Sequence, residues 1–333
     1  MPVNQYPKQA KQWGIIGPGK IAAKFAAALA ITEGAELAAV ASRDEARAGE
    51  FAGKFGAPRS YGDYGMLAKD PGVDAVYIAT PHGFHCEHAL LCLQQGKAVL
   101  CEKPMALSNR QVQEMVDASR THKTFLMEAM WTRFLPMTGK LLALIVEGRI
   151  GKVKYVRADF GFAPPFNPDG RLYNKALGGG SLLDIGIYPL FLCQLLLGEP
   201  SGIMAAAQLA PTGADDSCVA ALHYPDGALA VISSLFSCQT SITAEIAGTE
   251  GIIRIPTPWY KNNRLTLSRQ GLPDEEFRLE PVVNGFEYQI RETMRCMDNG
   301  LIESPDLTHA FSLSMSRVMD AIRKQCGVFY PGE

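Results

Sequence analysis

A lysine stands at the end of a short apolar run in the stretch Ala98–Met105, which reads AVLCEKPM. The run Ala98–Cys101 predicts a short buried strand, and Lys103 follows its carboxyl end. Open parallel α/β sheets bind ligands at the carboxyl ends of their strands, so Lys103 is a candidate to face a ligand crevice. Its ammonium could hydrogen-bond a substrate hydroxyl and shift the pKa of a neighbour, while Pro104 keeps its backbone out of helical torsions. A solvated lysine at a strand end fits the same position.

Asp184 and Tyr188 form a second candidate pair, in an apolar run that follows three glycines at 178–180. Their spacing of four residues places them on one face of the predicted helix 181–197. Because the residues around them are apolar, that face is not expected to be free surface, and both polar groups need partners. A buried structural Asp–Tyr pair, or a tyrosine bonded to the backbone, also fits the pattern.

The N-terminal segment carries the pattern G-x-G-x-x-A at Gly17, Gly19 and Ala22, between the predicted strand 13–16 and the predicted helix 21–30. Gly17 permits a tight turn, Gly19 lets backbone N–H groups approach a pyrophosphate, and Ala22 keeps helix and strand close. The helix N-terminus then favours the anion. A plain strand–turn–helix could carry the same glycines, but a place on the first of several strand–helix units favours a dinucleotide site.

The end of the second predicted strand bears on which nicotinamide dinucleotide would bind. An acidic residue there would bind the ribose 2′-hydroxyl of NAD. This chain has Ser42 and Arg43 instead, and a hydroxyl with a guanidinium suits a 2′-phosphate. The sequence therefore favours NADP as cofactor without excluding some use of NAD. In the alternative, Arg43 is solvated and Asp44 only caps the next helix.

The elements that must position these residues divide the chain into two parts. Strands and helices alternate up to about Ala129, which predicts a parallel sheet covered on both faces. The strands expected there are 13–16, 37–41, 74–79, 98–101 and 124–127, and the helices are 21–30, 44–54, 87–95 and 111–120. Beyond that point strand-like segments follow one another, which predicts a mainly antiparallel sheet. The expected strands are 153–162, 217–223, 228–236, 242–246 and 252–255, with helices 138–147, 181–197, 285–299 and 310–324.

We therefore expect an α/β protein with an N-terminal Rossmann dinucleotide-binding domain at 1–128. A C-terminal α+β domain at 129–333 would bind substrate and form dimer contacts. The Pro- and Gly-rich stretch 163–180 is a candidate pocket loop. The segment Ala228–Ile232 is apolar on both alternating faces, so the second sheet should be covered, most simply by a second copy in a homodimer.

Bulk composition is that of a soluble globular enzyme. The chain has 333 residues, of which 47% are apolar and 20% charged, and the net charge is −2 with no basic block. We expect no nucleic-acid partner, and no membrane partner because no leader-like segment or membrane-length apolar run is evident. Eight cysteines without a C-x-x-C pair predict reduced, mostly buried thiols and a cytoplasmic location. His85 and His88 are too few and too closely spaced for a metal site.

Three motifs in order carry a resemblance to a known family: the G-x-G-x-x-A loop, the run Glu102-Lys103-Pro104, and the pattern G-G-G-x-x-x-D-x-G that ends at Gly186. With them, nearly the whole chain resembles the glucose–fructose oxidoreductase family, also called Gfo/Idh/MocA. Most of that family has a histidine at the place of Tyr188. The tyrosine, together with Met127–Phe134, resembles the dimeric dihydrodiol dehydrogenase branch, which includes NADP-dependent D-xylose dehydrogenases.

The resemblance implies a role for each catalytic candidate. Tyr188 would be the general acid/base for the reacting hydroxyl, and Lys103 would hydrogen-bond the same oxygen and lower the pKa of the tyrosine toward neutrality. Asp184 would orient a substrate hydroxyl or the lysine. The cofactor would carry the hydride, at C4 of the nicotinamide, and no metal would be needed.

The remaining site residues that we expect fall into two groups. Contacts to the cofactor are expected from Gly17, Gly19, Lys20, Ile21, Ala22, Ser42, Arg43, Thr80, Pro81, His82, His85, Glu102 and Lys103. By resemblance, Trp131, Arg133 and Phe160 would line the substrate pocket, and Phe286 is a weaker candidate. Interdomain packing is the alternative for these side chains, and packing of its own helix is the alternative for His85.

These features together predict an NADP-dependent oxidoreductase that interconverts an alcohol and a carbonyl on a small molecule. The substrate would be an aldose, a polyol or a trans-dihydrodiol. The alternative from another class is a non-catalytic NADP-binding regulator on the same fold. The presence of both Lys103 and Tyr188 favours the enzyme.

Overall fold

The N-terminal part of the chain folds around a six-stranded parallel sheet. The structure, a computed structural model, describes residues 10–331. The strand order is β3-β2-β1-β4-β5-β6, the order of a doubly wound dinucleotide-binding fold. The strands are β1 (Lys11–Ile16), β2 (Ala35–Ala41), β3 (Arg59–Tyr61), β4 (Ala75–Ile78), β5 (Ala98–Glu102) and β6 (Leu126–Ala129).

Helices cover both faces of this sheet, so its central strands are buried from end to end. Every residue of β4 and β5 is buried, which explains why these strands read as continuous apolar runs rather than alternating ones. The helices are α1 (Lys20–Leu29), α2 (Glu45–Phe55), α3 (Tyr64–Lys69), α4 (His85–Leu93) and α5 (Asn109–His122), with a 3₁₀ turn η1 (His82–Phe84).

The second part is built on an eight-stranded sheet of order β14-β13-β12-β11-β7-β10-β9-β8. All neighbours are antiparallel except β7 and β10, so the sheet is mixed but mainly antiparallel, as predicted. Its strands are β7 (Val153–Gly161), β8 (Gly202–Leu209), β9 (Asp215–His223), β10 (Leu229–Leu235), β11 (Ala244–Gly248), β12 (Ile252–Ile255), β13 (Arg264–Ser268) and β14 (Glu275–Arg278).

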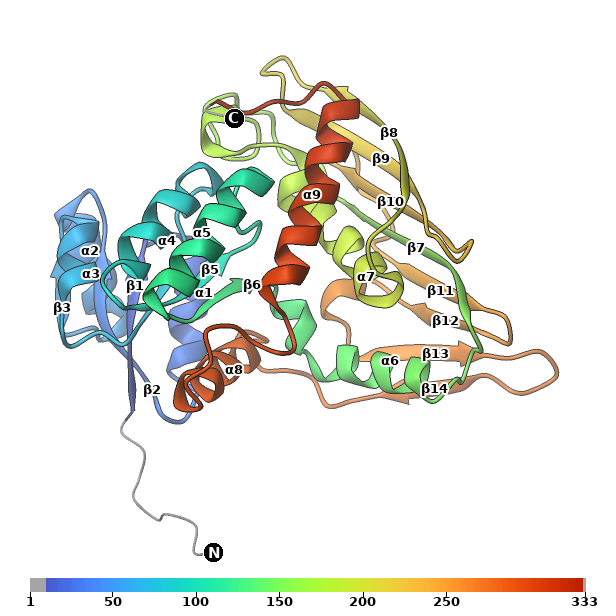
Figure 1. Cartoon of the computed structure of the whole chain (residues 1–333), viewed down its shortest axis with the longest axis horizontal. Helices are drawn as coiled ribbons and strands as arrows, with labels where there is room; N and C mark the ends of the chain where they lie inside the picture. Colours follow the sequence, from blue (N-terminus) through green and yellow to red (C-terminus); the bar gives the residue numbers. More distant parts are fainter. Residues whose placement is uncertain (1–9, 332–333) are drawn as a thin grey trace, which may run out of the picture.

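Helices of the second part lie on the side of its sheet that faces the first part, and α8 (Glu287–Asp298) lies below the first sheet beside α1 in Figure 1. The others are α6 (Pro136–Val146), α7 (Ile187–Leu197) and α9 (His309–Gln325), with a π-helical turn η4 (Leu182–Gly186) before α7 and 3₁₀ turns η2 (Trp131–Phe134), η3 (Lys175–Leu177) and η5 (Trp259–Lys261). The last helix returns to the first part: Asn109 N donates to Asp320 Oδ2 at 2.9 Å, which joins α5 to α9. The predicted boundary at 128/129 falls at the last residue of β6.

The predicted pattern of strands and helices is confirmed, with omissions at the sheet edges. The elements that the sequence did not indicate are β3, α3, β8, β13 and β14. Four of these five are strands at or next to an edge, where fewer residues are buried and the hydrophobic pattern is weaker. The predicted helix 181–197 is present, but its first turn is π-helical.

One helical segment, 175–197, is apolar and long enough to cross a membrane by length and composition, contrary to the expectation that no such run exists. In the structure 83% of its apolar window is buried inside the fold. Its α7 portion packs against β7 and α9, so the segment serves here as the central helix of the second part.

The glycines at 178–180 let the chain pass between the two parts. Gly178 has φ +79°, and a Cβ there would lie 2.6 Å from His82 Cβ and 2.7 Å from Leu107 Cδ2. No side chain fits, so this glycine permits η3 to dock against η1 next to the strand ends.

We expect Gly178→Ala to reduce the free energy of unfolding by more than the ~1–2 kcal/mol that a left-handed conformation costs an L-residue, because the clash adds to it. Urea unfolding monitored by circular dichroism measures this loss. Gly271→Ala is the matched control, because Gly271 has φ +75° with no atom near a Cβ. Equal losses in the two variants would contradict the packing argument.

Candidate active site

A cleft of about 1060 Å³ lies at the carboxyl ends of β1, β4 and β5, where the first sheet meets η4 and α7. Both parts of the chain contribute to its walls. The sequence candidates that line it are Gly17, Gly19, Lys20, Ile21, Ser42, Arg43, Thr80, Pro81, His82, Glu102, Lys103, Trp131, Asp184, Tyr188 and Phe286. The fold therefore brings together the glycine loop, the lysine and the Asp–Tyr pair that lie far apart in the sequence.

The glycine loop forms one wall of the cleft. Gly17 has φ +89°, and a Cβ there would lie 2.8 Å from Thr80 Cγ2, so the turn requires glycine. No atom of residues 10–331 lies within 4 Å of a Cβ built at Gly19, which leaves the adjacent cleft open to a ligand. Gly19 is also the cap residue of α1 and has no side chain to accept from the first N–H groups of that helix. Ala22 is fully buried behind the loop, where it keeps α1 close to the sheet as predicted, but it does not line the cleft and so is not one of the expected cofactor contacts.

Three cationic side chains line the wall around α1 and the end of β2. Arg43 is exposed and lies 5.7 Å from the Phe84 ring, while the Ser42 side chain is buried beside it. Asp44 caps α2 by accepting from Arg47 N at 3.2 Å, so the alternative proposed for Asp44 is correct and compatible with a cleft-lining Arg43. Lys20 and Arg47 also line this wall, and Arg47 was not indicated by the sequence.

Asp184 lies between two cations on the opposite wall. Lys103 Nζ donates to the Asp184 backbone oxygen at 2.5 Å and lies 3.5 Å from Asp184 Oδ1. Arg171 NH1 donates to the same Oδ1 at 2.9 Å. Burial opposes the charge of this carboxyl, yet Lys103 and Arg171 hold the pKa of Asp184 well below its usual value. Asp184 is therefore ionised and orients the ammonium of Lys103, which directly follows β5 and precedes a cis Lys103–Pro104 peptide.

Tyr188 presents its phenol oxygen to Trp131 rather than to Lys103. Trp131 Nε1 donates to Tyr188 Oη at 3.0 Å, whereas Lys103 Nζ lies 4.9 Å from the centroid of the tyrosine ring. Burial, with the charge of Glu102 next, raises the pKa of Tyr188 well above its usual value, and the hydrogen bond from Trp131 opposes that rise. The expectation that Lys103 lowers the pKa of Tyr188 toward neutrality is therefore wrong. Tyr188 holds its proton, which suits a general acid.

Aromatic rings pack behind Tyr188 and hold its orientation. The ring centroids of Phe160 and Tyr188 are 5.7 Å apart. The Tyr260 ring stacks on Phe160, with centroids 4.5 Å apart, and its centroid lies 5.1 Å from that of Tyr188. Phe160 is 9% exposed and does not line the cleft, so the packing alternative is the correct one for this residue.

The two histidines at the start of α4 have different positions. His82 lines the cleft, and its Nδ1 lies 3.1 Å from Gly178 O; burial lowers the pKa of His82 to about 3, so the ring is neutral. His85 is fully buried, with ring nitrogens 2.8 Å from Thr80 O and 2.8 Å from Pro104 O. It does not reach the cleft, contrary to its place among the predicted cofactor contacts. It ties together the two loops that carry Thr80 and Lys103.

Glu102 lines the cleft while its carboxylate is turned into the protein. It accepts a short hydrogen bond from the buried Tyr77 hydroxyl and another from Lys103 N at 3.2 Å. Burial raises the pKa of Glu102. Tyr77 thus fixes the residue that precedes the catalytic lysine candidate.

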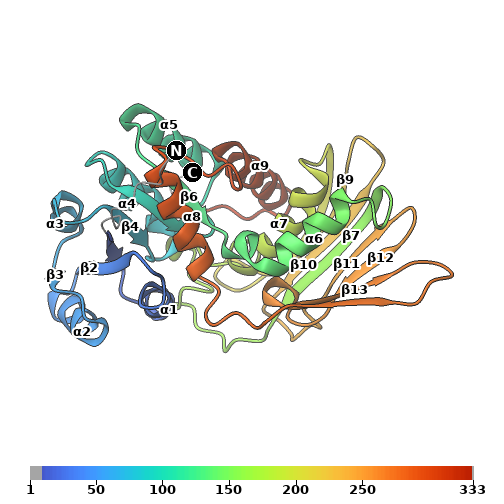
Figure 2. The same cartoon turned by 90° about the horizontal axis from the view of Figure 1, so that it is seen from below.

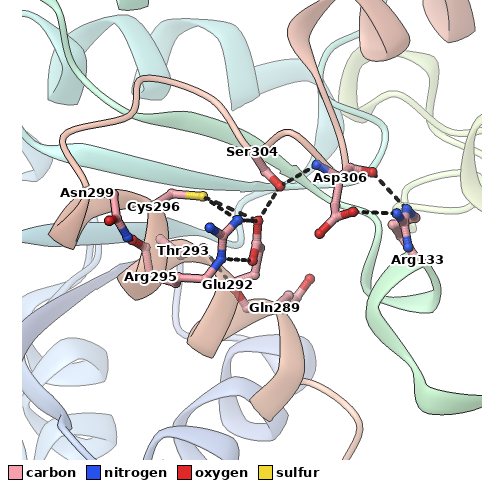
Figure 3. Close-up of polar contacts among 9 residues, drawn as sticks. All are labelled: Arg133, Gln289, Glu292, Thr293, Arg295, Cys296, Asn299, Ser304 and Asp306. Atoms are coloured by element: carbon pink, nitrogen blue, oxygen red, sulfur yellow. Dashed lines mark hydrogen bonds and ion pairs between the residues drawn. The ribbon is translucent and has the colours of Figure 1, made fainter. Parts of the chain in front are cut away.

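Arg133 is absent from the lining of the cleft, which corrects the prediction that it lies in the substrate pocket. Figure 3 shows its guanidinium on Asp306, with Nε donating to Asp306 O and NH2 to Asp306 Oδ1, each at 2.7 Å. Asp306 N in turn donates to Ser304 Oγ, which donates to Glu292 Oε1 of α8 at 2.5 Å. Arg133 therefore fixes η2, the turn that carries Trp131, to the segment between α8 and α9.

A buried carboxylate anchors the start of the helical segment that carries Asp184 and Tyr188. Asp215 Oδ2, at the start of β9, accepts from Leu182 N at 2.6 Å and from Ser181 Oγ at 2.8 Å. These bonds satisfy an N–H group and a hydroxyl at the first turn of η4.

Besides Arg47, the charged cleft residues Arg171 and Lys24 were missed by the sequence analysis although weak signals existed. Arg171 comes from 163–180, which was a candidate pocket loop, but nothing in the sequence pairs it with Asp184. Lys24 follows Lys20 by four residues on α1, so helical periodicity could have placed both on the cleft face. Within residues 10–331, no group of three or more His, Cys, Asp or Glu side chains could hold a metal ion.

Comparison with known proteins agrees with this arrangement. The model of the oxidoreductase family with an NAD-binding Rossmann fold matches residues 11–130, and the model of the Gfo/Idh/MocA C-terminal domain matches residues 139–254. The chain thus belongs to the Gfo/Idh/MocA oxidoreductase family.

Relatives and solved structures match over nearly the whole chain. Trans-1,2-dihydrobenzene-1,2-diol dehydrogenase of Danio rerio is 40% identical, with 96% of this chain and 98% of the relative covered. The Homo sapiens enzyme of the same name is 36% identical, with 97% and 98% covered. An aldose-aldose oxidoreductase of Caulobacter crescentus, complexed with glycerol, superposes with a TM-score of 0.88 at 26% identity, covering 96% and 98%. A 3-ketoreductase of Actinomadura kijaniata, solved with NADP and TDP-benzene, gives 0.86 at 27% identity with the same coverage.

We expect Trp131→Phe to raise the pKa of Tyr188 further, because the indole N–H stabilises the phenolate. For alcohol oxidation, in which Tyr188 must accept a proton, the acidic limb of kcat/KM against pH should move upward. One lost hydrogen bond to a charged group, ~1.5–3 kcal/mol, corresponds to about 1–2 pH units. The pH profiles of the two proteins measure this shift.

Trp259→Phe is the matched control for this prediction, because Trp259 Nε1 donates to Asp159 O and not to Tyr188. Its pH profile should follow that of the parent protein. A profile for Trp131→Phe that does not move, or one that moves equally in the control, would contradict the role of the Trp131–Tyr188 hydrogen bond.

Proposed function

We propose that this protein is an NADP-dependent dehydrogenase that interconverts an alcohol and a carbonyl on an aldose, a polyol or a trans-dihydrodiol. The observation that carries the proposal is the cleft itself, where Lys103, Asp184 and Tyr188 stand opposite the glycine loop. The dihydrodiol dehydrogenase relatives and the sugar-type oxidoreductases among the solved structures support the substrate class.

NADP is the favoured cofactor on the chemistry of the residues around the end of β2. Ser42, Arg43 and Arg47 offer a hydroxyl and two guanidinium groups and no free carboxylate for a ribose hydroxyl, since Asp44 caps α2. Guanidinium groups match phosphate geometry, which supports recognition of the 2′-phosphate. The related 3-ketoreductase was solved with NADP, in agreement with this choice.

NADP, when bound, supplies the hydride acceptor or donor of the reaction. Tyr188 Oη exchanges the proton of the reacting hydroxyl, and the ammonium of Lys103 donates a hydrogen bond to the same oxygen. Asp184 holds Lys103 in place through its backbone oxygen and its carboxylate, and Arg171 stabilises the charge of that carboxylate. In oxidation Tyr188 first gives up its own proton to solvent; the substrate then loses one proton to the phenolate oxygen and one hydride to the cofactor. In reduction the substrate gains one proton from Tyr188 and one hydride from the cofactor.

A non-catalytic NADP-binding regulator remains the alternative on this fold. Against it stands the convergence of Lys103 and Tyr188 on one cleft, 4.9 Å from ammonium to ring centroid. A regulator needs the glycine loop but has no need of an acid/base pair beside it.

Purified protein should reduce NADP with at least one member of a panel of D-xylose, D-glucose, inositols and a trans-dihydrodiol. Lys103→Met and Tyr188→Phe should each lower kcat by about 10²–10⁴-fold, because positioned proton transfer supplies that factor. Both variants should still bind NADPH, which fluorescence titration measures.

His82→Asn serves as the comparison variant in this assay, because His82 lines the cleft but has no part in the proton transfer. It should lose much less activity than the other two. Tight NADPH binding with no turnover over the whole panel would favour the regulator, and full activity of Tyr188→Phe would refute the assigned acid/base.

Arg43→Ala should raise the KM for NADP by about 10–100-fold, the value of one or two hydrogen bonds to a charged group, and leave the KM for NAD unchanged. Steady-state kinetics with both cofactors measure this difference. Arg110→Ala, an arginine on α5 outside the cleft, is the control. An equal effect of Arg43→Ala on both cofactors would exclude contact with the 2′-phosphate.

The two-part division belongs to the same proposal: residues 1–128 would hold the cofactor, and residues 129–333 would bind substrate and form a homodimer. No helix of residues 10–331 covers the outer face of the eight-stranded sheet (Figure 2). On that face Met204, Val219 and Leu229 are 74%, 46% and 50% exposed, which favours a second copy as cover.

We also propose a cytoplasmic location, since all eight cysteines are free thiols and six of them are buried.

Light scattering at micromolar concentration should give the mass of a dimer, and Val219→Lys should reduce it to that of a monomer by placing a charge in the interface. Leu272→Lys is the control, because Leu272 is 52% exposed in the turn between β13 and β14, at the other end of the sheet from Val219. A parent protein that is already monomeric would refute the dimer.

A further inference from the structure

A second cavity of about 270 Å³, here called the side cavity, adjoins the cleft. It lies between α1, the η2–α6 turn, the residues after η5, and the segment 279–284 that precedes α8. Lys24 and Trp131 line both the side cavity and the cleft. Since Trp131 Nε1 also contacts Tyr188 Oη, the side cavity begins one side chain away from the proposed acid/base.

Two cations border the side cavity without an ion pair. Lys24 Nζ lies 4.3 Å from the ring centroids of both Trp131 and Phe286, and Lys261 Nζ lies 5.7 Å from that of Tyr260. Within residues 10–331 neither ammonium has a carboxylate within 4 Å. Burial lowers the pKa of Lys24, with the charge of Lys261 as the next cause. A bound anion would offset both effects.

The acidic groups near these lysines do not neutralise the side cavity. Glu102 and Glu287 act on Lys24 only through longer-range attraction. The carboxylate of Glu287 is already used, because it accepts from Gly285 N at 2.6 Å. Glu280 lines the side cavity but is exposed to solvent, where its charge is screened.

The walls of the side cavity are held in place by side-chain amides. Asn284 Nδ2 donates to Lys24 O at 2.9 Å, which fastens the segment 279–284 to α1. Asn263 Nδ2 donates to Leu279 O at 2.7 Å, and Asn262 Nδ2 donates to Pro256 O at 2.9 Å. These bonds preorganise the cavity, so a ligand need not order its walls.

The apolar part of the wall suits the carbon face of a sugar ring. Trp131, Leu135, Met137 and Val282 contribute to it. The volume lies just below the usual range of ~300–1,000 Å³ for ligand pockets, so it fits a small group and not a nucleotide. An apolar wall with two ammonium groups at its border is the composition of a site for an acidic sugar unit.

We propose that the side cavity binds an anionic substituent of the substrate, a carboxylate or a phosphate on a sugar, with Lys24 and Lys261 as its cationic contacts. The inference rests on the proposed function, since it assigns a substrate class to that same cleft. It makes acidic sugars better ligands than their neutral parents. Glu280 lies on the same cavity wall, and its solvent-screened charge opposes such a ligand only weakly.

The test is calorimetric binding of D-glucuronate, D-glucose 6-phosphate and D-glucose, with and without saturating NADP and at ~20 and ~200 mM salt. At least one acidic sugar should bind about tenfold more tightly than glucose, as charge-assisted bonds predict, and the advantage should shrink at the higher salt. The advantage should persist with NADP bound, because the cofactor then fills the cationic wall near Arg43. If only glucuronate binds more tightly than glucose, the anionic substituent is a carboxylate. If only glucose 6-phosphate does, it is a phosphate. If both do, the side cavity accepts either anion.

Variants distinguish binding in the side cavity from a general effect of the protein's charge on an anionic ligand. Lys261→Met should abolish most of the preference for acidic sugars over glucose, and Glu280→Gln should increase that preference. Lys140→Met removes an equal charge from a lysine that stacks on Phe277 and lines neither cavity, so it should leave the advantage unchanged. No preference for acidic sugars, a preference lost when NADP binds, or one that survives Lys261→Met would each overturn the inference. Because binding is measured without turnover, these outcomes are distinct from failure of the dehydrogenase assay.

Discussion

The shared carboxylate of Asp184 is the interaction on which the cleft depends. A buried charge without partners is unstable, and Asp184 remains ionised only because Lys103 and Arg171 both reach its Oδ1. The two cations come from different places, one after β5 of the parallel sheet and one from the irregular segment before η3. The attraction of Lys103 to Asp184 therefore holds the ligand-binding edge of the first sheet against the helix of the second part, and Arg171 stabilises the shared carboxylate from within that part.

Burial raises the pKa of both ionisable groups of that helical segment, and the charges beside each group decide the final direction. Asp184 has cations at its oxygen, and its pKa falls despite burial. Tyr188, four residues later, has aromatic rings behind it and the charge of Glu102 nearby, and its pKa rises. A pair of groups whose environments separate their pKa values in this way divides the work of orientation and proton transfer between them. Among residues 10–331, the Trp131 N–H is the hydrogen-bond donor to the phenol oxygen, and it favours the ionised form of the tyrosine.

The proposed catalytic residues and the proposed substrate-facing walls lie on different kinds of segment. Lys103, Asp184 and Tyr188 lie at a strand end and on a buried helical segment, which are rigid parts of the fold. Arg171, Lys261 and the segment 279–284 lie on loops or a short turn. Loops can change without repacking the core, so relatives with one chemistry can differ in the substrate that they accept. The side cavity is lined largely by such loop residues, and Trp131 connects it to Tyr188 through a hydrogen bond.

The sequence by itself determined the two sheets, the glycine loop and the three catalytic candidates, because strand ends, helical spacing and turn glycines follow local rules. It also indicated a cationic contact at the end of β2. Only the tertiary structure decided that Arg171 pairs with Asp184, that Trp131 reaches across 57 residues to Tyr188, and that His85, Phe160 and Arg133 lie outside the cleft. Arg133, for example, is held by Asp306, 173 residues away. Such contacts depend on how distant segments pack, and no local periodicity encodes the distance between them.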